Sequence, residues 1–158
     1  MFKKFNLKPN IDNRRTLTAL ELKDYVDFEV KRIYYFYDIK NEAGLPALPA
    51  GRQASSVGAP EPNGSASDRK AGGHCHKVEK ELFICQRGET ILEIDEGDGL
   101  KDIPLKQNEA VYVGNYVWHR FKSASPDVMI LALSSTNYNP SREDYIETYQ
   151  EFFETLKH

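Results

Sequence analysis

Three histidines, His74, His76 and His119, have the residue type and spacing best suited to chemistry in this chain. His74 and His76 are two positions apart, and on a β-strand such a pair projects from the same face. An imidazole with an unperturbed pKa of about 6.5 can accept or deliver a proton close to neutral pH. Two imidazoles on one face could therefore serve neighbouring atoms of one substrate as base and acid.

The elements that must position these histidines are predicted to be strands. From Gly73 onward, short apolar or aromatic runs alternate with turn residues such as Gly88 and Gly114, a pattern typical of an all-β sandwich or barrel. The expected strands are Leu82–Cys85, Thr90–Ile94, Ala110–Val113, Trp118–Phe121 and Val128–Leu133.

In the first half of the chain, residues 1–29 are predicted to form short strands joined by turns. Val30–Ile39 is rich in β-branched and aromatic residues and is the clearest strand there. Alternation places Arg32, Tyr34 and Phe36 on one face. The other face then carries Ile33, Tyr35 and Tyr37.

The C-terminal segment has a different period. Tyr145, Tyr149, Phe152 and Leu156 recur every three to four residues, which predicts one amphipathic helix whose aromatic stripe packs on the barrel. Ser141 and Asp144, which follow Pro140, resemble an acidic variant of a capping box.

A Gly/Pro/Ala/Ser-rich insertion at about residues 44–70 interrupts an otherwise single domain of 158 residues. It contains no aromatic residue, so it buries too little apolar surface to offset its ordering entropy. We expect a flexible surface excursion. A plain spacer and a lid over the site are the two interpretations.

Composition excludes several classes of protein. The net charge of -3 does not favour nucleic-acid binding, and no apolar run is long enough to span a bilayer. The N-terminal residues do not resemble a signal peptide, so we expect a cytoplasmic location. Cys75 and Cys85 are too few for a disulfide framework and are expected to be reduced thiols packed in strands.

Two motifs resemble those of the cupin superfamily. The first is His74-x-His76, four residues, Glu81, six residues and Gly88, and the second is Gly114, four residues and His119. The resemblance implies a small jelly-roll barrel. In metal-dependent cupins these three histidines and the carboxylate bind one divalent cation, and such a set suits Zn, Mn, Fe, Ni or Co.

A second resemblance covers nearly the whole chain outside the insertion. The chain resembles the WxcM-like sugar 3,4-ketoisomerases, cupins that act on dTDP-4-keto-6-deoxyglucose. The similar segments are DNRRTLTALE (12–21), FEVKRIYY (28–35), GHCHK (73–77), YVGNYVWH (112–119) and DYI (144–146) followed by Tyr149.

This second resemblance implies acid–base catalysis with no metal or other cofactor. The implied catalytic residues are His74, His76 and Tyr34, with His74 as the base at sugar C3 and His76 as its partner, although either order is compatible with the sequence. The residues expected to bind substrate are Arg14, Arg15, Arg32, Glu81, Tyr116, Trp118 and His119.

Several of these assignments have plainer alternatives. Arg14 and Arg15 are otherwise solvated surface residues, and Tyr34, Tyr116 and Trp118 are otherwise barrel-wall aromatics. For His119 the alternatives are a residue of the pocket wall, a hydrogen-bond donor and a metal ligand.

The sequence also departs from the family in two places. Arg15 replaces the usual Gly, so either arginine could be the binder. Glu81 replaces the usual Gln and restores the metal ligand of other cupins.

The resemblance further implies a homodimer, with exchanged N-terminal strands as one possible arrangement, and a dTDP-linked 4-keto-6-deoxyhexose as the small-molecule partner. Neither a nucleic acid nor a membrane is expected as a partner. Three alternatives stay open: a metal-dependent cupin enzyme, a non-catalytic sugar-nucleotide binding module, and epimerisation of the same sugar at C3 and C5.

Overall fold

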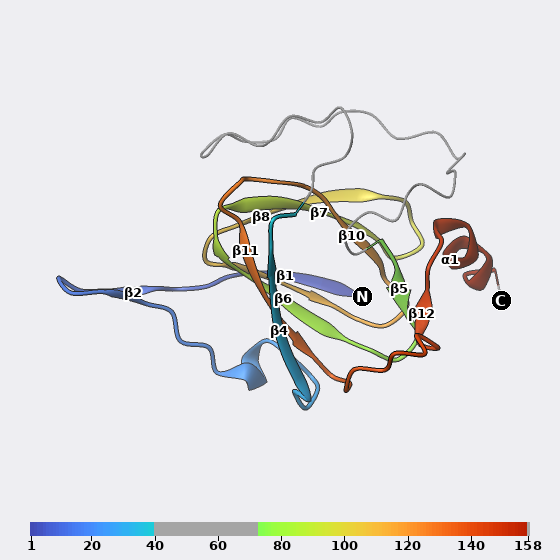
Figure 1. The fold of residues 1–158 in the computed structure, drawn as a ribbon, viewed down its shortest axis with the longest axis horizontal. Helices are drawn as coiled ribbons and strands as arrows, with labels where there is room; N and C mark the ends of the chain where they lie inside the picture. Colours follow the sequence, from blue (N-terminus) through green and yellow to red (C-terminus); the bar gives the residue numbers. More distant parts are fainter. Residues whose placement is uncertain (40–72, 158) are drawn as a thin grey trace.

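The computed structural model describes residues 1–39 and 73–157, and these form a barrel of antiparallel strands with one helix near the C-terminus (Figure 1). The first sheet has the order β1-β9-β6-β11-β4. Its strands are β1 (Phe2–Asn6), β9 (Glu109–Val113), β6 (Glu81–Arg87), β11 (Met129–Ser134) and β4 (Arg32–Tyr37).

The opposite wall is built on the order β10-β7-β8, from β10 (Trp118–Ala124), β7 (Glu89–Asp95) and β8 (Lys101–Lys106). A short pair, β5 (Cys75–His76) with β12 (Tyr145–Ile146), joins this wall because His74 forms a β-bridge with His119 of β10. The core between the two walls includes Leu92, Val111 and Ile130, which are fully buried.

Alternating burial confirms the predicted faces of β4. Ile33, Tyr35 and Tyr37 are 58–65% exposed, whereas Arg32, Tyr34 and Phe36 are partly buried. Phe36 meets Phe83 and Phe121 edge to face in the core. The alternation therefore directs Arg32 and Tyr34 toward the same interior as the histidines.

The five strands predicted after Gly73 are confirmed as β6, β7, β9, β10 and β11, whereas β8 was not predicted. Its sequence, KDIPLK, carries charges and Pro104, which count against a strand in a sequence-based prediction. Pro104 is compatible with this strand because β8 lies at the edge of its sheet, where a residue without an amide proton is tolerated.

The N-terminal prediction of short strands is also confirmed. After β1 the chain forms β2 (Asn10–Ile11), β3 (Thr16–Leu17) and a 3₁₀ turn at Leu22–Asp24. The β2–β3 hairpin projects from the barrel on the side away from β5 and β12 (Figure 1).

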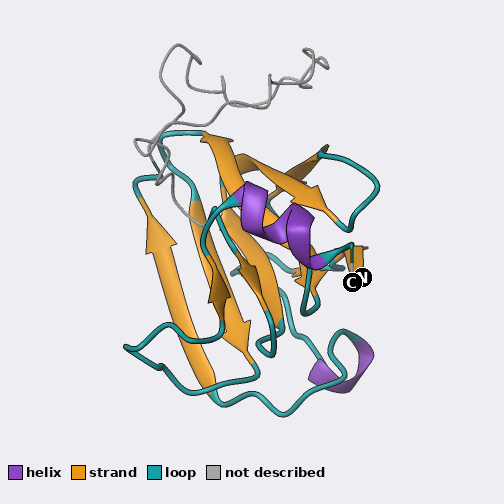
Figure 2. Cartoon of the chain, turned by 90° about the vertical axis from the view of Figure 1, so that its right-hand side faces the viewer, coloured by secondary structure: helices purple, strands orange, loops and turns teal. Residues whose placement is uncertain are grey.

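The C-terminal helix is shorter than its predicted stripe, and the predicted capping box is wrong. α1 spans Tyr149–Thr155, and its N-cap is Thr148, whose hydroxyl accepts from the amide of Glu151 at 3.2 Å. Tyr145 lies in β12, because Asp144 and Tyr145 are held beside β5 by hydrogen bonds that a helix could not accommodate. Figure 2 shows α1 lying against the outside of the strands.

The structure also describes the two cysteines, which were predicted to be reduced thiols packed in strands. Cys75 and Cys85 are buried free thiols, and burial raises the pKa of each to about 12, as expected for unreactive packed thiols. Residues 44–70, predicted to be an insertion, lie outside the described residues. Among those described, no helix has the length and apolar character needed to cross a bilayer.

The two adjacent phenylalanines of α1 give a matched test of how the helix is attached. Phe152 is fully buried and packs on Trp118, whereas Phe153 is 46% exposed. Phe152→Ala should lower the free energy of unfolding by about 3–5 kcal/mol, the range for a truncated core aromatic. Phe153→Ala should cost less than about 1 kcal/mol. Urea unfolding of both variants checks this, and equal losses would show that α1 is not anchored through Phe152.

Candidate active site

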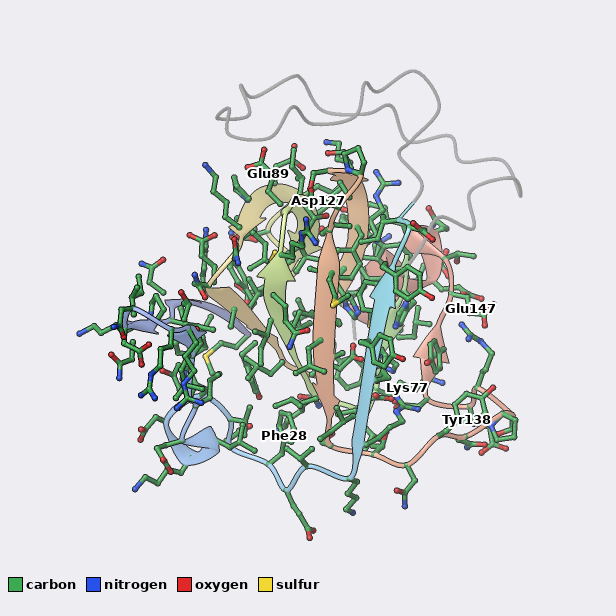
Figure 3. The ribbon with its side chains drawn as sticks, turned by 60° about the vertical axis from the view of Figure 1, so that its left-hand side comes forward. Phe28, Lys77, Glu89, Asp127, Tyr138 and Glu147 are labelled. Atoms are coloured by element: carbon green, nitrogen blue, oxygen red, sulfur yellow. The ribbon has the colours of Figure 1, made fainter. Side chains whose placement is uncertain are left out.

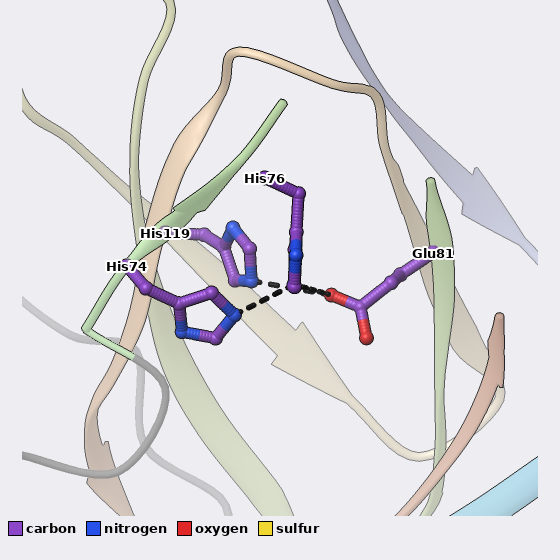
Figure 4. Close-up of side chains that lie close together, drawn as sticks. All are labelled: His74, His76, Glu81 and His119. Carbon is purple, nitrogen blue, oxygen red and sulfur yellow. Dashed lines mark hydrogen bonds and ion pairs between the residues drawn. The ribbon is translucent and has the colours of Figure 1, made fainter. Parts of the chain in front are cut away.

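The histidines converge because β5 is attached to β10 at the site itself. The His74 amide donates to the His119 carbonyl at 3.1 Å, and the His119 amide donates back at 2.9 Å. The His74 ring centroid then lies 4.5 Å from that of His76 and 4.5 Å from that of His119. Figure 4 shows the three rings pointing into one small space. The sequence-based prediction that His74 and His76 share a face is thus confirmed.

Glu81 of β6 closes this space from the opposite wall. Its Oε2 lies 3.3 Å from His119 Nε2 and 3.6 Å from His76 Nε2 (Figure 4). Burial raises the pKa of Glu81, but the hydrogen bond and charge of His119, the charge of His76 and the hydrogen bond from Tyr34 outweigh it, so the pKa is lowered. Glu81 is therefore a buried carboxylate whose charged form the neighbouring rings stabilise.

A direct ring-to-ring contact joins the two histidines of the HCH segment. His74 Nε2 and His76 Nε2 are 2.8 Å apart, a hydrogen-bond distance. Two lone pairs would repel at this distance, so one proton must lie between the rings. His76 is buried, while His74 is partly exposed and is the ring of this pair that solvent or a ligand can reach.

Tyr34 and Arg32 reach the site from β4, as their predicted face requires. The Tyr34 hydroxyl donates to Glu81 Oε1. Burial, followed by the charge of Glu81, raises the pKa of Tyr34, so its phenol stays protonated and remains a donor. Arg32 lies over the Tyr34 ring at 5.1 Å and donates to Glu79 Oε1 at 2.5 Å.

Three residues at the site were not predicted from the sequence: Glu79, Asp144 and Tyr145. Asp144 Oδ2 lies 3.0 Å from His76 Nδ1. The Tyr145 ring lies 4.4 Å from that of His76, and the Arg142 guanidinium lies 3.8 Å above Tyr145. The helical period of the C-terminal segment concealed Asp144 and Tyr145, although the DYI segment that contains them also carried the family resemblance.

Among the described residues, four predicted substrate-binding side chains make no ring contact with the histidines. Trp118 and His119 are consecutive on β10, so Trp118 points to the opposite face and packs on Tyr149 of α1 at 5.4 Å. Tyr116 is 45% exposed, and its amide donates to the His76 carbonyl at 2.6 Å. Arg14 and Arg15 are exposed in the turn of the β2–β3 hairpin, where Asp12 Oδ1 accepts from both amides.

The site lies toward one end of the barrel. Figure 3 places Lys77, the residue after β5, and Tyr138 near that end, and Glu89 and Asp127 near the other. The Arg32 guanidinium lies 5.9 Å from the Tyr138 ring. Arg32 therefore lies between the partly buried Tyr34 and the exposed Tyr138.

The histidines and Glu81 also have the spacing of a metal site. One ligand atom from each of His74, His76, Glu81 and His119 lies within 4.8 Å of the others. Ligand bonds of about 2.0–2.2 Å would place ligand atoms at comparable separations, so these residues fit a divalent cation. Such an ion would act as a Lewis acid on a bound carbonyl.

Comparison with known proteins gives consistent matches. The model of the family described as "FdtA: WxcM-like, C-terminal" matches residues 64–157. A TDP-4-oxo-6-deoxy-α-D-glucose 3,4-oxoisomerase of Aneurinibacillus thermoaerophilus is 30% identical over 151 residues, which are 95% of this chain and 88% of that protein.

Two solved structures are similar to this chain over nearly its whole length. A 3,4-ketoisomerase from Helicobacter canadensis has a TM-score of 0.74 at 29% identity, over 99% of this chain and 98% of that one. A TDP-quinovose 3,4-ketoisomerase from Campylobacter jejuni has a TM-score of 0.70 at 27% identity, over 97% of each chain. The matches confirm the predicted cupin-type jelly roll, and the similarity extends well beyond the histidine motif.

The buried His76 should make the fold sensitive to acid. Burial lowers the pKa of His76, more than the nearby carboxylate of Glu81 raises it. Below the ordinary histidine pKa of about 6.5, the unfolded chain therefore binds a proton that the folded chain resists, so stability falls as pH falls. Glu81, whose pKa is lowered, adds to this loss at still lower pH.

Melting temperatures at pH 7 and pH 5 test this dependence. The wild type should lose more stability over this interval than His76→Gln, which lacks the titrating ring. Phe153→Ala, an exposed change on α1, should keep the wild-type slope. Equal slopes for wild type and His76→Gln would contradict the assignment.

Proposed function

Because the chain belongs to the WxcM-like family of sugar 3,4-ketoisomerases, we propose that it converts dTDP-4-keto-6-deoxyglucose into a dTDP-3-keto-6-deoxyhexose by acid–base catalysis. The observation that carries the mechanism is the 2.8 Å contact between His74 Nε2 and His76 Nε2. One buried and one accessible ring that share a proton supply both a base and a proton reservoir.

The reaction moves a carbonyl from C4 to C3 of the sugar. A base removes the proton from C3, the C–H electron pair forms the C3–C4 double bond, and O4 takes up negative charge or a proton. The resulting enediol or enediolate then loses the O3 proton, C3 becomes the carbonyl, and C4 receives a proton. Atoms and electrons balance without any oxidant.

His74 is the proposed base at C3 because it is the accessible ring of the pair. Once protonated, it can pass the proton to His76 across the 2.8 Å contact and receive it back. Tyr34 is the proposed donor toward the developing oxyanion, since burial keeps its phenol protonated. Its one hydroxyl proton would turn from Glu81 Oε1 to the sugar oxygen when substrate binds. The sugar would then lie between β5 and β4, against Tyr145.

Proton NMR of the purified protein with dTDP-4-keto-6-deoxyglucose, with EDTA present, tests the proposal. We expect the 3-keto sugar to form in D₂O and in H₂O, with the C4 configuration read from couplings in H₂O. His74→Asn and His76→Asn should each reduce kcat by about 10²–10⁴-fold, and Phe153→Ala should leave it unchanged.

Three other outcomes would contradict this function. Deuterium at C3 or C5 without carbonyl migration would indicate an epimerase. Tight binding of dTDP without turnover would indicate a binding module. No turnover with EDTA, followed by turnover when a divalent metal is added, would indicate a metal-dependent enzyme.

The metal-dependent enzyme is the second candidate, because the four convergent ligand atoms favour it. It predicts about one equivalent of Zn, Mn, Fe, Ni or Co in the purified protein, lost in Glu81→Gln together with activity. For the metal-free reaction, Glu81→Gln should keep measurable activity, since Gln also accepts from Tyr34.

We further propose a homodimer in which the β2–β3 hairpin of one subunit brings Arg14 and Arg15 to the site of the other. This proposal follows from the exposed position of both arginines on a hairpin that projects away from their own histidines. Arginine suits this role because its planar fork binds diphosphate oxygens in pairs. The cytoplasmic location expected from the sequence stays a prediction.

Mixed dimers test whether Arg14 and Arg15 act at the partner's site or at the site of their own subunit. One subunit would carry Arg14→Ala and Arg15→Ala, and the other His74→Asn, each with a different purification tag. If the arginines act on the partner's site, the doubly purified heterodimer has one complete site and regains about half of the wild-type activity. If they act within their own subunit, both sites stay defective and no activity returns.

A further inference from the structure

Asp144 forms the most direct contact between the His pair and the rest of the fold. Its Oδ2 lies 3.0 Å from His76 Nδ1 and accepts from the Glu79 amide at 3.1 Å, and its Oδ1 accepts from the Val78 amide at 2.6 Å. A carboxylate can only accept, so the contact with the ring is a hydrogen bond when the proton is on Nδ1. We infer that Asp144 is a positioning residue that holds His76 in the tautomer with its proton on Nδ1. The catalytic part of this inference rests on the proposed function.

Backbone contacts hold the Asp144 carboxylate in place independently of its contact with the His76 ring. The two amides that bind it belong to the turn after β5, and the Lys77 amide donates to the Asp144 carbonyl at 2.9 Å. The next residue, Tyr145, pairs with His76 in the β12–β5 ladder. Backbone pairing on both sides therefore sets the position of the acceptor, as preorganisation of a site requires.

Glu79 does not compete for the same proton. Its Oε2 lies 3.7 Å from His76 Nδ1, beyond a hydrogen bond, while its Oε1 accepts from Arg32 and from the Ser134 hydroxyl, each at 2.5 Å. Asp144 is thus the carboxylate within hydrogen-bond distance of Nδ1 among the described residues.

A proton on His76 Nδ1, donated to Asp144, sets the direction of proton transfer between His74 and His76. Neutral His76 then presents an unprotonated Nε2 to His74 at 2.8 Å, and the shared proton belongs to His74 Nε2. His76 is consequently ready to accept a proton that His74 takes from substrate. With Nε2 protonated, His74 takes the substrate proton on its Nδ1. In the other tautomer, His76 would present a proton to His74 Nε2, the single proton of neutral His74 would then lie on Nδ1, and His74 would have no nitrogen left to act as a base.

A purely structural role for Asp144 is the alternative, since its carboxylate also organises a turn. Asp95 offers a matched control. Its Oδ1 accepts from the amides of Gly97 and Gly99 at 2.7 and 2.9 Å, and its Oδ2 accepts from the Tyr149 hydroxyl at 2.5 Å. Asp95→Asn makes the same chemical change in a turn-binding carboxylate that contacts no histidine.

Asp144→Asn should reverse the tautomer. The amide side chain introduced by this change has one oxygen, and the shorter contact with the Val78 amide favours its placement at the Oδ1 position. The NH₂ group then lies at the Oδ2 position, where it gives up the hydrogen bond from the Glu79 amide but donates to His76 Nδ1, so the ring proton moves to Nε2. We expect kcat to fall by about 10²–10⁴-fold, the range for lost general acid–base catalysis, with the loss of an orienting carboxylate at its upper end, while KM changes less than about threefold.

The ¹⁵N chemical shifts of the histidine rings, assigned with His76→Asn, report the tautomer directly. We expect the Nδ1–H form of His76 in wild type and in Asp95→Asn, and the Nε2–H form in Asp144→Asn. An Nε2–H form in the wild type would overturn the inference without any variant at Asp144. Unchanged kcat in a folded Asp144→Asn protein would overturn it as well.

Failure of the proposed function is distinguishable from failure of this inference. If the wild type does not isomerise the sugar, the proposed function fails. The ¹⁵N spectra still decide whether Asp144 sets the His76 tautomer.

Discussion

The backbone bridge between His74 and His119 is the interaction on which the site depends. Its two hydrogen bonds attach the two-residue strand β5 to the long strand β10, and β12 adds to the outer side of β5. A two-residue strand has little stability of its own. The reactive pair is therefore held by the barrel through His119, and the same residue supplies backbone pairing and a ring for the site.

That arrangement also explains how four ionisable groups share a small buried space. A buried carboxylate is costly unless donors surround it, and Glu81 has the Tyr34 hydroxyl on Oε1 and His119 on the side of Oε2. His119 Nδ1 is fixed by the Val117 carbonyl at 3.1 Å, so its Nε2 points inward. Val117 thus orients the ring of His119 and Asp144 that of His76, and the Nε2 atoms of both rings face inward and are left for chemistry.

Sequence patterns predicted most of the fold because alternation and periodicity report local structure. They predicted the face of Tyr34 and the shared face of His74 and His76, which depend only on position within a strand. They failed for Asp144, because a hydrogen bond across 68 residues of chain has no local signature. The helical spacing of the same segment suggested a capping role, and the tertiary contact with β5 overrode it.

Arg14 shows a different limit of the sequence. Family resemblance assigns it to the site, yet a single chain carries it in an exposed hairpin remote from β5. The proposed homodimer would reconcile the two facts, because the hairpin of a second subunit would complete the site. A two-stranded hairpin of this length would gain stability from packing on such a neighbour, as isolated hairpins are marginal in water.

Glu81 sets the chemical character of this site, at a position where the family resemblance implies Gln. A Gln amide would provide one acceptor and one donor, so it could satisfy Tyr34 and a neutral His119 with no charge. A carboxylate offers only acceptors, so the 3.3 Å approach of His119 Nε2 to Oε2 is favourable only when a proton lies between them. The substitution therefore either retains an additional proton beside the His pair or provides the fourth ligand of a cation. Both results follow from one charge placed where three imidazoles converge.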